Sequence, residues 1–442
     1  MIARVLKIVV AVVVVVGLGL FLWLWSTPRA TAFAGDSVAL AAYSGANPTG
    51  VPAEMAGASL VQRGEYLTRA ADCQACHTAL NGKEFAGGLA FVLPFGTIYS
   101  TNITPDKTGI AGYSDAQWLA MMRHGKRRDG AQLYPAMPFA TYALMTDADA
   151  LAIKAYLMTL EPVAAPARAN TLGWPYNQRS LVTLWSTFFN PAKPFEPTPS
   201  RSPEWNRGAY LAEAMAHCGD CHTPRNLAYA LDNRNKYAGA IAAGWRSHNI
   251  SSDKERGVGG WTDAALASYL SKGFATGHGV AAGPMGEAVD MGLSHLTAGD
   301  IKALVTYLRT IPAVSGDGPA KVMKAAPAAF DKGIVGAGDR LGEKVFAGAC
   351  ASCHDWSGVS PVTGHATLTG VSAVNDPGGN NVAQAVMFGV HRRGIPTMPS
   401  FGNSYTDREI AAVVNYVTAR FGAKGSALDE GDVAELRKQT GQ

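Results

Sequence analysis

The hydrophobic pattern separates an apolar run near the N-terminus from a long remainder with helical periodicity. Ile8 to Trp25 is a run of 18 residues without a charge. As a helix it spans about 27 Å, close to the thickness of the hydrocarbon core of a bilayer. Arg4 and Lys7 precede the run, and basic residues beside a membrane helix favour the cytoplasmic side. The pattern therefore predicts a transmembrane anchor over residues 1–27 with a cytoplasmic N-terminus.

A cleaved signal peptide is the alternative interpretation of this run, because Ala32-Phe33-Ala34 resembles a cleavage site. The apolar run is longer than the roughly 7–15 residues of a signal peptide. Trp23 and Trp25 also lie where the aromatic belt of a membrane helix belongs. Both observations favour a retained anchor.

Helical periodicity returns three times further along the chain, each time after a helix-start signal. A threonine is followed three residues later by an acid, the sequence of a capping box, and then by apolar residues at helical spacing. A tyrosine lies about two helical turns after each acid. The three sets are Thr146, Asp149 and Tyr156; Thr297, Asp300 and Tyr307; and Thr406, Glu409 and Tyr416. Each set predicts the final helix of a repeated unit.

An earlier helix is predicted in each unit around a shared glycine: Gly64, Gly208 and Gly342. Because glycine has no side chain, we expect the early and final helices of each unit to cross closely. The first two units also share a middle block, residues 102–104 and 249–251, that the third lacks. The third unit is therefore predicted to be smaller and more divergent.

Composition adds limited constraints. Charged residues make up 16% of the chain, against about 25% in typical soluble domains. The 49 glycines and 24 prolines describe a loop-rich chain. A net charge of +4 without a basic run argues against a nucleic-acid partner.

Each unit contains the sequence Cys-x-x-Cys-His, the attachment signature of c-type haem. Two thiols at this spacing can add to the two vinyl groups of one porphyrin, and the adjoining imidazole then serves as proximal iron ligand. Zinc sites and thiol redox centres also use Cys-x-x-Cys, but three copies each followed by His favour haem. The motifs consume all six cysteines: Cys73, Cys76 and His77; Cys218, Cys221 and His222; Cys350, Cys353 and His354. The sequence therefore predicts three covalently bound haem c groups, attached on the periplasmic side of a bacterial inner membrane.

The sixth ligand of each iron decides between electron transfer and chemistry at an open site. A methionine beside a proline stands 8 to 12 residues before each final capped helix: Met137, Met285 and Met398. Methionines also fill gaps in cores, but three in register favour axial ligands. The predicted iron ligands are therefore His77 with Met137, His222 with Met285, and His354 with Met398.

The remaining histidines do not recur at matching positions in all three units. We interpret them as surface or propionate-side groups: His124, His217, His248, His278, His295, His365 and His391. Arg225 and the pair Arg392-Arg393 are candidate partners for haem propionates, although surface solvation explains them almost equally well.

These patterns predict a mainly α fold, with three tandem class I-like cytochrome c domains after one N-terminal transmembrane helix. The expected order is an anchor over 1–27, a linker over 28–55, domain 1 over 56–165, a linker with an aromatic-rich helix over 166–200, domain 2 over 201–313, a linker over 314–335, domain 3 over 336–424 and a polar tail over 425–442.

The aromatic-rich segment from Leu172 to Phe189 has two interpretations. It is either a helix that fills the groove between two haem domains or an amphipathic segment that touches the membrane surface or a quinone.

Taken together, the three haem motifs, Tyr-Pro-Ala-Met-Pro-Phe at 134–139 and Cys-His-Thr-Pro-Arg-Asn at 221–226 resemble the triple-haem cytochrome c subunit of bacterial membrane-bound dehydrogenases. The resemblance covers about residues 56–422. It implies a non-catalytic subunit that takes electrons from a catalytic partner and passes them to ubiquinone.

The family resemblance leaves the partner open among three types. These are quinoprotein alcohol dehydrogenases, flavin-dependent sugar or gluconate dehydrogenases, and molybdopterin aldehyde dehydrogenases, the last with a small iron–sulfur subunit. Several cytochromes of the alcohol and sugar enzymes carry their hydrophobic attachment near the C-terminus. This chain has its apolar run at the N-terminus, which is more similar to the aldehyde dehydrogenase type.

Two other functions use the same haem motifs. A multihaem peroxidase needs an open iron and an acid–base group above it, which the three aligned methionines argue against. A cytochrome that donates electrons to a terminal oxidase differs only in its partner.

Overall fold

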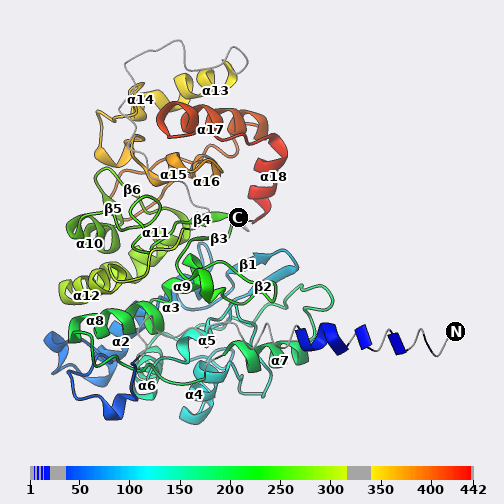
Figure 1. The fold of residues 1–442 in the computed structure, drawn as a ribbon, viewed down its shortest axis with the longest axis vertical. Helices are drawn as coiled ribbons and strands as arrows, with labels where there is room; N and C mark the ends of the chain where they lie inside the picture. Colours follow the sequence, from blue (N-terminus) through cyan, green and yellow to red (C-terminus); the bar gives the residue numbers. More distant parts are fainter. Residues whose placement is uncertain are drawn as a thin grey trace.

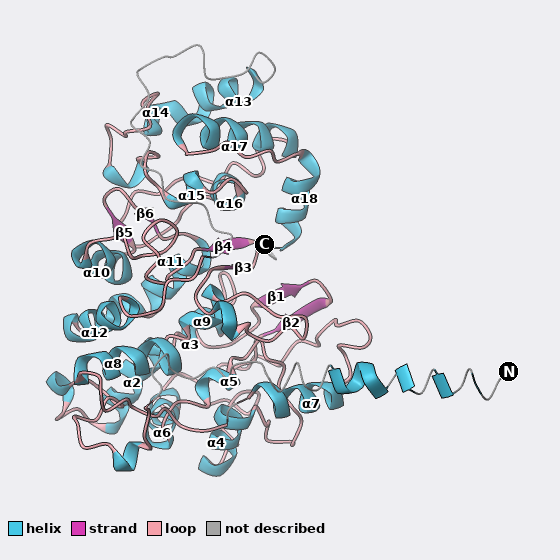
Figure 2. Ribbon diagram, in the orientation of Figure 1, coloured by secondary structure: helices cyan, strands magenta, loops and turns pink. Residues whose placement is uncertain are grey.

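The computed structural model describes residues 36–190, 192–315 and 340–439, with isolated positions between 4 and 19 (Figure 1). The described residues are mainly helical, with three two-stranded antiparallel hairpins (Figure 2). The predicted mainly α fold is confirmed. Most of the predicted anchor and of the linker over 314–335 lies outside the described residues. Within the part that is described, we find no helix with both the length and the hydropathy needed to cross a bilayer.

The first unit is built around two crossing helices, α2 (Leu60–Ala70) and α6 (Asp147–Leu157). Ser59 and Thr146 cap their first turns through side-chain oxygens. Between them lie α3 (Cys73–Cys76), β1 (Ala90–Leu93), β2 (Gly96–Tyr99), α4 (Asp115–His124) and α5 (Phe139–Tyr142).

The second unit repeats this order around α8 (Pro203–Tyr210) and α12 (Ala298–Leu308). The α8 helix continues into a π-helical turn, η3 (Leu211–Met215). Between the crossing helices follow α9 (Cys218–His222), η4 (Asn233–Asn235), β3 (Ala240–Ala242), β4 (Trp245–Ser247), α10 (Asp263–Lys272), β5 (Phe274–Ala275), β6 (Gly279–Val280), α11 (Gly283–Met291) and η5 (Leu293–His295).

The third unit is shorter and lies at the far end of the long axis from α4 and α6 (Figure 1). Its crossing helices are α13 (Arg340–Val345) and α17 (Asp407–Phe421). The other elements are η6 (Phe346–Cys350), α14 (Ala351–His354), η7 (Gly364–Ala366), α15 (Ser372–Asn375), α16 (Asn380–Phe388) and α18 (Glu430–Gln439).

The predicted close crossing of early and final helices is confirmed in all three units. A Cβ added to the shared glycine would overlap a backbone carbonyl oxygen of the final helix. It would also approach the Cβ of the tyrosine that follows the capping acid. The pairs are Gly64 with Tyr156 at 2.9 Å, Gly208 with Tyr307 at 2.8 Å and Gly342 with Tyr416 at 2.9 Å.

Replacing Gly208 by alanine is therefore expected to destabilise the protein. Alanine normally favours a helix over glycine by about 1 kcal/mol, but here its Cβ would meet the backbone of Ala303, and overpacking costs about 1–3 kcal/mol. We expect a net loss of about 2 kcal/mol in the free energy of unfolding, measured by denaturant titration. Gly57→Ala is the control, because no atom lies within 4 Å of its added Cβ. Equal stability of the two variants would contradict the crossing.

The buried apolar residues of the described chain form two clusters. One runs through the first and second units without interruption, from Tyr66 to Ile311, and the other lies within the third unit, from Val345 to Leu436. The first two units therefore share one core.

The acids that open the final helices behave as predicted only in part. The backbone N–H groups of Asp149 and Asp300 donate to the preceding threonine hydroxyls, each at 3.2 Å. Their side chains turn away from the threonine and are buried, at 1% and 2% exposure. In the third unit the capping box is complete, because Thr406 N–H donates to Glu409 Oε2 at 2.8 Å. The prediction of a full box is wrong for the first two units.

Each buried acid instead accepts a hydrogen bond from a tyrosine of the other unit. Tyr66 Oη donates to Asp300 Oδ2 at 2.6 Å, and Tyr210 Oη donates to Asp149 Oδ2 at 2.6 Å. Arg207 adds two contacts to Asp300, at 2.8 and 2.6 Å. Each unit thus supplies one tyrosine and one aspartate to the contact with the other. The first two units therefore form a pseudo-symmetric pair.

Part of the segment predicted as the first linker packs on this seam. The Gly50 N–H donates to Asp149 at 2.9 Å, and the Gly50 carbonyl accepts from Arg207 at 2.8 Å. Gly50 therefore contacts Asp149 directly and is linked to Asp300 through Arg207.

The aromatic-rich segment forms α7 (Arg179–Phe189), which lies between the first two units. Trp185 packs edge-on against Phe139 of the first unit, with ring centroids 6.3 Å apart. Its indole N–H donates to the carbonyl of Ala228 in the second unit at 2.9 Å. The helix therefore contacts both units, but none of its residues is fully buried, and both interpretations of the segment stay open. Leu181 and Leu184 remain about half exposed, at 49% and 56%.

The segment predicted as a polar tail contains a packed helix, α18. Val433 and Leu436 are buried against the third unit, and Arg437 Nε lies 2.6 Å from Asp407 Oδ1. Two apolar residues three apart were too weak a pattern to predict this helix.

Candidate functional site

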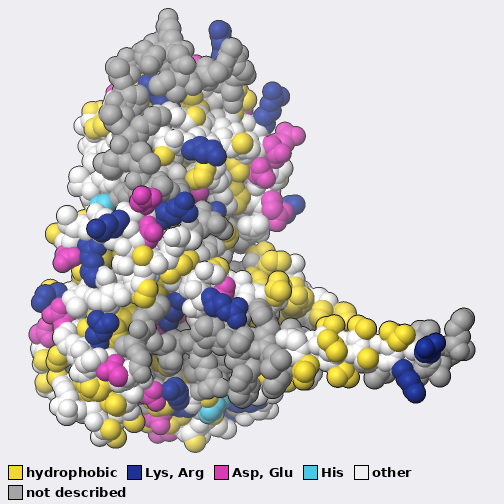
Figure 3. Space-filling view, viewed as in Figure 1, with side chains coloured by type: hydrophobic (Ala, Val, Ile, Leu, Met, Phe, Trp, Pro, Cys, Tyr) yellow, Lys and Arg dark blue, Asp and Glu magenta, His cyan; other side chains and the backbone are white. Residues whose placement is uncertain are grey.

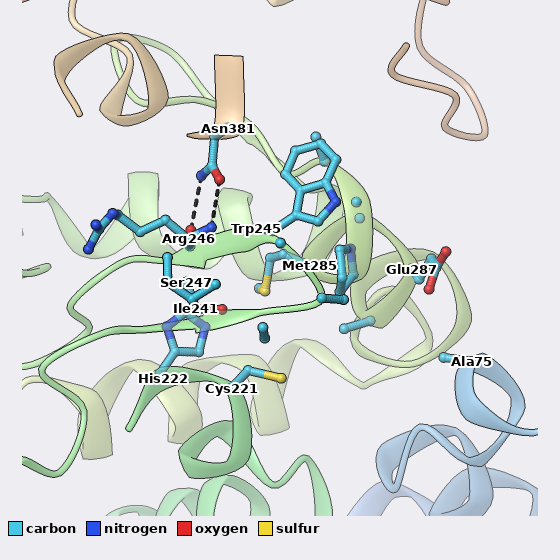
Figure 4. A pocket seen from close by; sticks show the side chains of 18 of the residues that line it. Ala75, Cys221, His222, Ile241, Trp245, Arg246, Ser247, Met285, Glu287 and Asn381 are labelled. Carbon is cyan, nitrogen blue, oxygen red and sulfur yellow. Dashed lines mark hydrogen bonds between the residues drawn. The ribbon is translucent and has the colours of Figure 1, made fainter. Parts of the chain in front are cut away.

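Each Cys-x-x-Cys-His motif lies on or at the end of a short helix: α3, α9 and α14. The six cysteines form no disulfide with one another. Residues of the three motifs line one continuous cavity of about 2140 Å³. The lining includes Cys76, Cys218, Cys221, His222, Cys350 and His354. Figure 4 shows the part of this cavity beside Cys221 and His222.

The three motif histidines share one hydrogen bond. In each imidazole Nδ1 lies 2.6 Å from a backbone carbonyl oxygen, to which it donates, and Nε2 is thereby left as the coordinating nitrogen. Burial lowers the pKa of each imidazole, which favours the neutral form that binds a metal. The pairs are His77 with Thr101, His222 with His248 and His354 with Ala366. This donor set fits a haem iron.

The carbonyl partners were not found from the sequence, although a signal was present. Thr101 and His248 directly precede the middle blocks shared by the first two units. The third unit lacks the hairpin of β1 and β2 or of β3 and β4, yet Ala366 supplies the same carbonyl. In the first two units, the carbonyl that orients the proximal histidine therefore belongs to the residue directly before the shared block.

Burial also affects the thiols. It raises the pKa of Cys73 and Cys218 to about 12 and the pKa of Cys221 and Cys350 to about 11.

The three predicted methionine ligands follow a shared backbone arrangement. In each unit a helix ends at a glycine with positive φ, and a short antiparallel pairing leads to the methionine. The glycines are Gly125, Gly273 and Gly389, after α4, α10 and α16. Met285 and Met398 line the cavity, and Met137, like Cys73, packs against the core shared by the first two units. A glycine at the end of the helix before each methionine is visible in the sequence, but it was not used in the prediction of the ligands.

Two of the competing histidines are not surface groups. Burial lowers the pKa of His217, and its ring packs edge-on against Tyr142 at 5.6 Å. Burial likewise lowers the pKa of His248 to about 4. Its Nε2 lies 3.3 Å from Asn381 Nδ2 of the third unit. Both residues are half-buried and line the cavity, so for them the propionate-side alternative stays a prediction.

The candidate propionate arginines have different surroundings. The guanidinium of Arg392 contacts Asp290 and donates to the carbonyl of Gly273 at 3.0 Å, and Arg392 also lines the cavity. Its role as a propionate partner stays a prediction. Arg225 donates to the Asp220 carbonyl at 2.9 Å, and both Arg225 and Arg393 line the cavity.

Comparison with known proteins gives the family. Residues 61–161 match the family described as cytochrome c, and residues 337–417 match the family described as cytochrome c oxidase, cbb3-type, subunit III. The chain is 38% identical over 403 residues to the fructose dehydrogenase cytochrome subunit of Gluconobacter japonicus, covering 85% of this chain and 82% of that protein.

Two other relatives cover similar shares. The gluconate 2-dehydrogenase cytochrome c subunit of Pantoea cypripedii is 37% identical, with 87% of this chain and 91% of that protein covered. The cytochrome c subunit of alcohol dehydrogenase (quinone) of Gluconobacter oxydans is 35% identical, with 87% and 84% covered. The chain belongs to the cytochrome c subunits of dehydrogenase complexes, which are electron-transfer subunits rather than catalytic ones.

Proposed function

We propose that the chain holds three covalent haem c groups, one in each unit, and conducts electrons from a dehydrogenase subunit to ubiquinone. Two observations carry this proposal: each motif imidazole donates a hydrogen bond to a backbone carbonyl, and residues of all three motifs line one continuous cavity. Haem supplies the one-electron chemistry. The protein contributes the cysteines that attach each group, the histidine and methionine that ligate it, and apolar walls that exclude water.

A continuous cavity supports conduction within one polypeptide. The first two units share a core, and the third is joined to the second by side-chain contacts such as that of Asn381 with His248. Rigid units keep the distances between cofactors constant. The chain therefore transfers electrons between haems held at fixed positions, rather than by diffusing between its partners.

Quinone as acceptor is supported by the relatives named alcohol dehydrogenase (quinone). The apolar run Ile8 to Trp25 supports attachment to the bacterial inner membrane by one N-terminal helix, with the haem units in the periplasm. The half-exposed leucines of α7 and the exposed Leu227 offer an apolar surface for a lipid contact.

For the catalytic partner we favour a molybdopterin aldehyde dehydrogenase with a small iron–sulfur subunit, because the apolar run lies at the N-terminus. Quinoprotein alcohol dehydrogenases and flavin-dependent sugar or gluconate dehydrogenases are the alternatives. On the face seen in Figure 3, charged side chains are scattered rather than gathered in a patch, which suits a permanent interface better than a steered encounter. The cofactor of the large subunit that co-purifies distinguishes these partners.

Axial methionine ligation is tested by single alanine variants of Met137, Met285 and Met398. Methionine raises the potential of a haem relative to other ligands. Each variant is therefore expected to remove the weak methionine-to-iron absorption of one haem and to lower its potential, seen by spectroelectrochemical titration. Met158→Ala is the control, because its side chain is exposed at 40% and lies in no repeated motif. Three unchanged spectra would contradict the assignment.

A further inference from the structure

His248 takes part in two contacts at once. Its backbone carbonyl accepts the hydrogen bond from Nδ1 of His222 at 2.6 Å. Its imidazole Nε2 lies 3.3 Å from Nδ2 of Asn381, on helix α16 of the third unit. The corresponding residue of the first unit, Thr101, has an exposed side chain, and Ala366 of the third has no polar side chain. His248 therefore connects the proximal histidine of one unit to the body of another.

Asn381 also holds the strand that leads to His248. Its Oδ1 accepts from the N–H of Arg246 at 2.7 Å, and its Nδ2 donates to the carbonyl of Arg246 at 2.9 Å (Figure 4). Arg246 lies in β4, opposite Ile241 of β3. The amide thus binds the free edge of this hairpin as a neighbouring strand would, two residues before His248.

Further contacts fix α16 and its neighbours against the second unit. Arg246 Nε lies 2.8 Å from Asp376 Oδ2, and Asp376 is 1% exposed. Arg392 reaches across to Asp290 and to the carbonyl of Gly273. The third unit is therefore held on both sides of Asn381, and the amide has little freedom to move away from β4.

We propose that Asn381 is a positioning residue through which the third unit sets the reduction potential of the haem held by His222. The hydrogen bond from a ligating imidazole to a fixed acceptor raises the basicity of that ligand, and a more basic ligand lowers the potential of the iron. Asn381 acts by fixing β4 and His248, and so the position of the accepting carbonyl. This inference rests on the proposed function, because it requires a haem at His222.

The test uses the full chain in its native complex and compares Asn381→Ala with Asn415→Ala. The first variant frees β4 and His248, whereas the second removes the side-chain hydrogen bonds of an asparagine with residues 426–428 of the third unit and leaves Asn381 in place. We expect Asn381→Ala to shift the potential of the second haem in the positive direction and to leave the other two unchanged. Asn415→Ala, which changes no charge and does not line the cavity, is expected to leave all three potentials unchanged. A Met285→His variant identifies the second haem, because it lowers the potential of that haem alone.

His248→Ala provides a second route to the same result, since it keeps the backbone carbonyl and removes the imidazole. We expect a positive shift of the second haem here too. The double variant with Asn381→Ala should shift the potential by less than the sum, because the two residues act through one contact. Equal shifts in Asn381→Ala and Asn415→Ala, or no shift of the second haem in Asn381→Ala, would overturn the inference. Haem content is measured on the same samples. Three haems without the expected shift contradict this inference alone, whereas fewer than three haems in the wild-type chain contradict the proposed function.

Discussion

Replacing Cys218 and Cys221 together by alanine is expected to yield a protein with one haem fewer than the wild type. Without the two thiols no covalent bond to the porphyrin can form, although His222 remains. The same loss is expected from the pair Cys73 and Cys76, and from the pair Cys350 and Cys353. Mass spectrometry of the denatured chain measures the result, since only covalent haem survives denaturation.

Ser352→Ala is the matched control for the cysteine variants. It lies between the two cysteines of the third motif but supplies no bond to haem, so the full haem content should remain. A wild-type mass that corresponds to fewer than three haems, or a cysteine pair whose loss leaves the haem content unchanged, would contradict the assignment.

Replacing Asp300 by asparagine is expected to produce a large loss of stability. Asp300 is buried, accepts from Tyr66 and pairs with Arg207, whose side chain is only 12% exposed. Removing the charge leaves a largely buried guanidinium without its carboxylate, and breaking such a pair costs roughly 3–5 kcal/mol. Denaturant unfolding of the purified chain measures the change in the free energy of unfolding.

Glu409→Gln is the control, because Glu409 stands at the same place in the third unit. Its side chain closes an exposed capping box, and glutamine can close the same box. A change of less than about 0.5 kcal/mol is expected. Similar losses in the two variants would show that the acid acts only as a helix cap in every unit.

The sequence was informative where function or close packing restricts the residue type. Cysteine spacing is set by the porphyrin, and the glycines of the crossing helices have no substitute, because any Cβ would meet a backbone carbonyl. Repetition then made both patterns visible three times in one chain. The close crossing of the helices was predicted correctly, and haem attachment by the six cysteines stays a prediction.

Contacts between distant parts of the chain were not predictable in the same way. The threonine–acid pattern looks alike in all three units, yet Asp149 and Asp300 turn toward tyrosines in the neighbouring unit, 61 and 234 residues away. Asn381 lies 133 residues from His248 and carries no motif. Local sequence specifies a helix start in each case, but the partner of the side chain depends on how the units pack.

The most direct measurement is the redox state of the haems in the purified native complex under anaerobic conditions. The substrate of the catalytic subunit is added first, and a soluble ubiquinone analogue second, while the α-band absorbance of haem c is followed. We expect reduction equivalent to three haems per chain after the first addition and full reoxidation after the second, with no reduction when the isolated cytochrome receives the substrate. Haems that stay oxidised while the quinone is reduced, or an isolated cytochrome that oxidises the substrate by itself, would contradict the account.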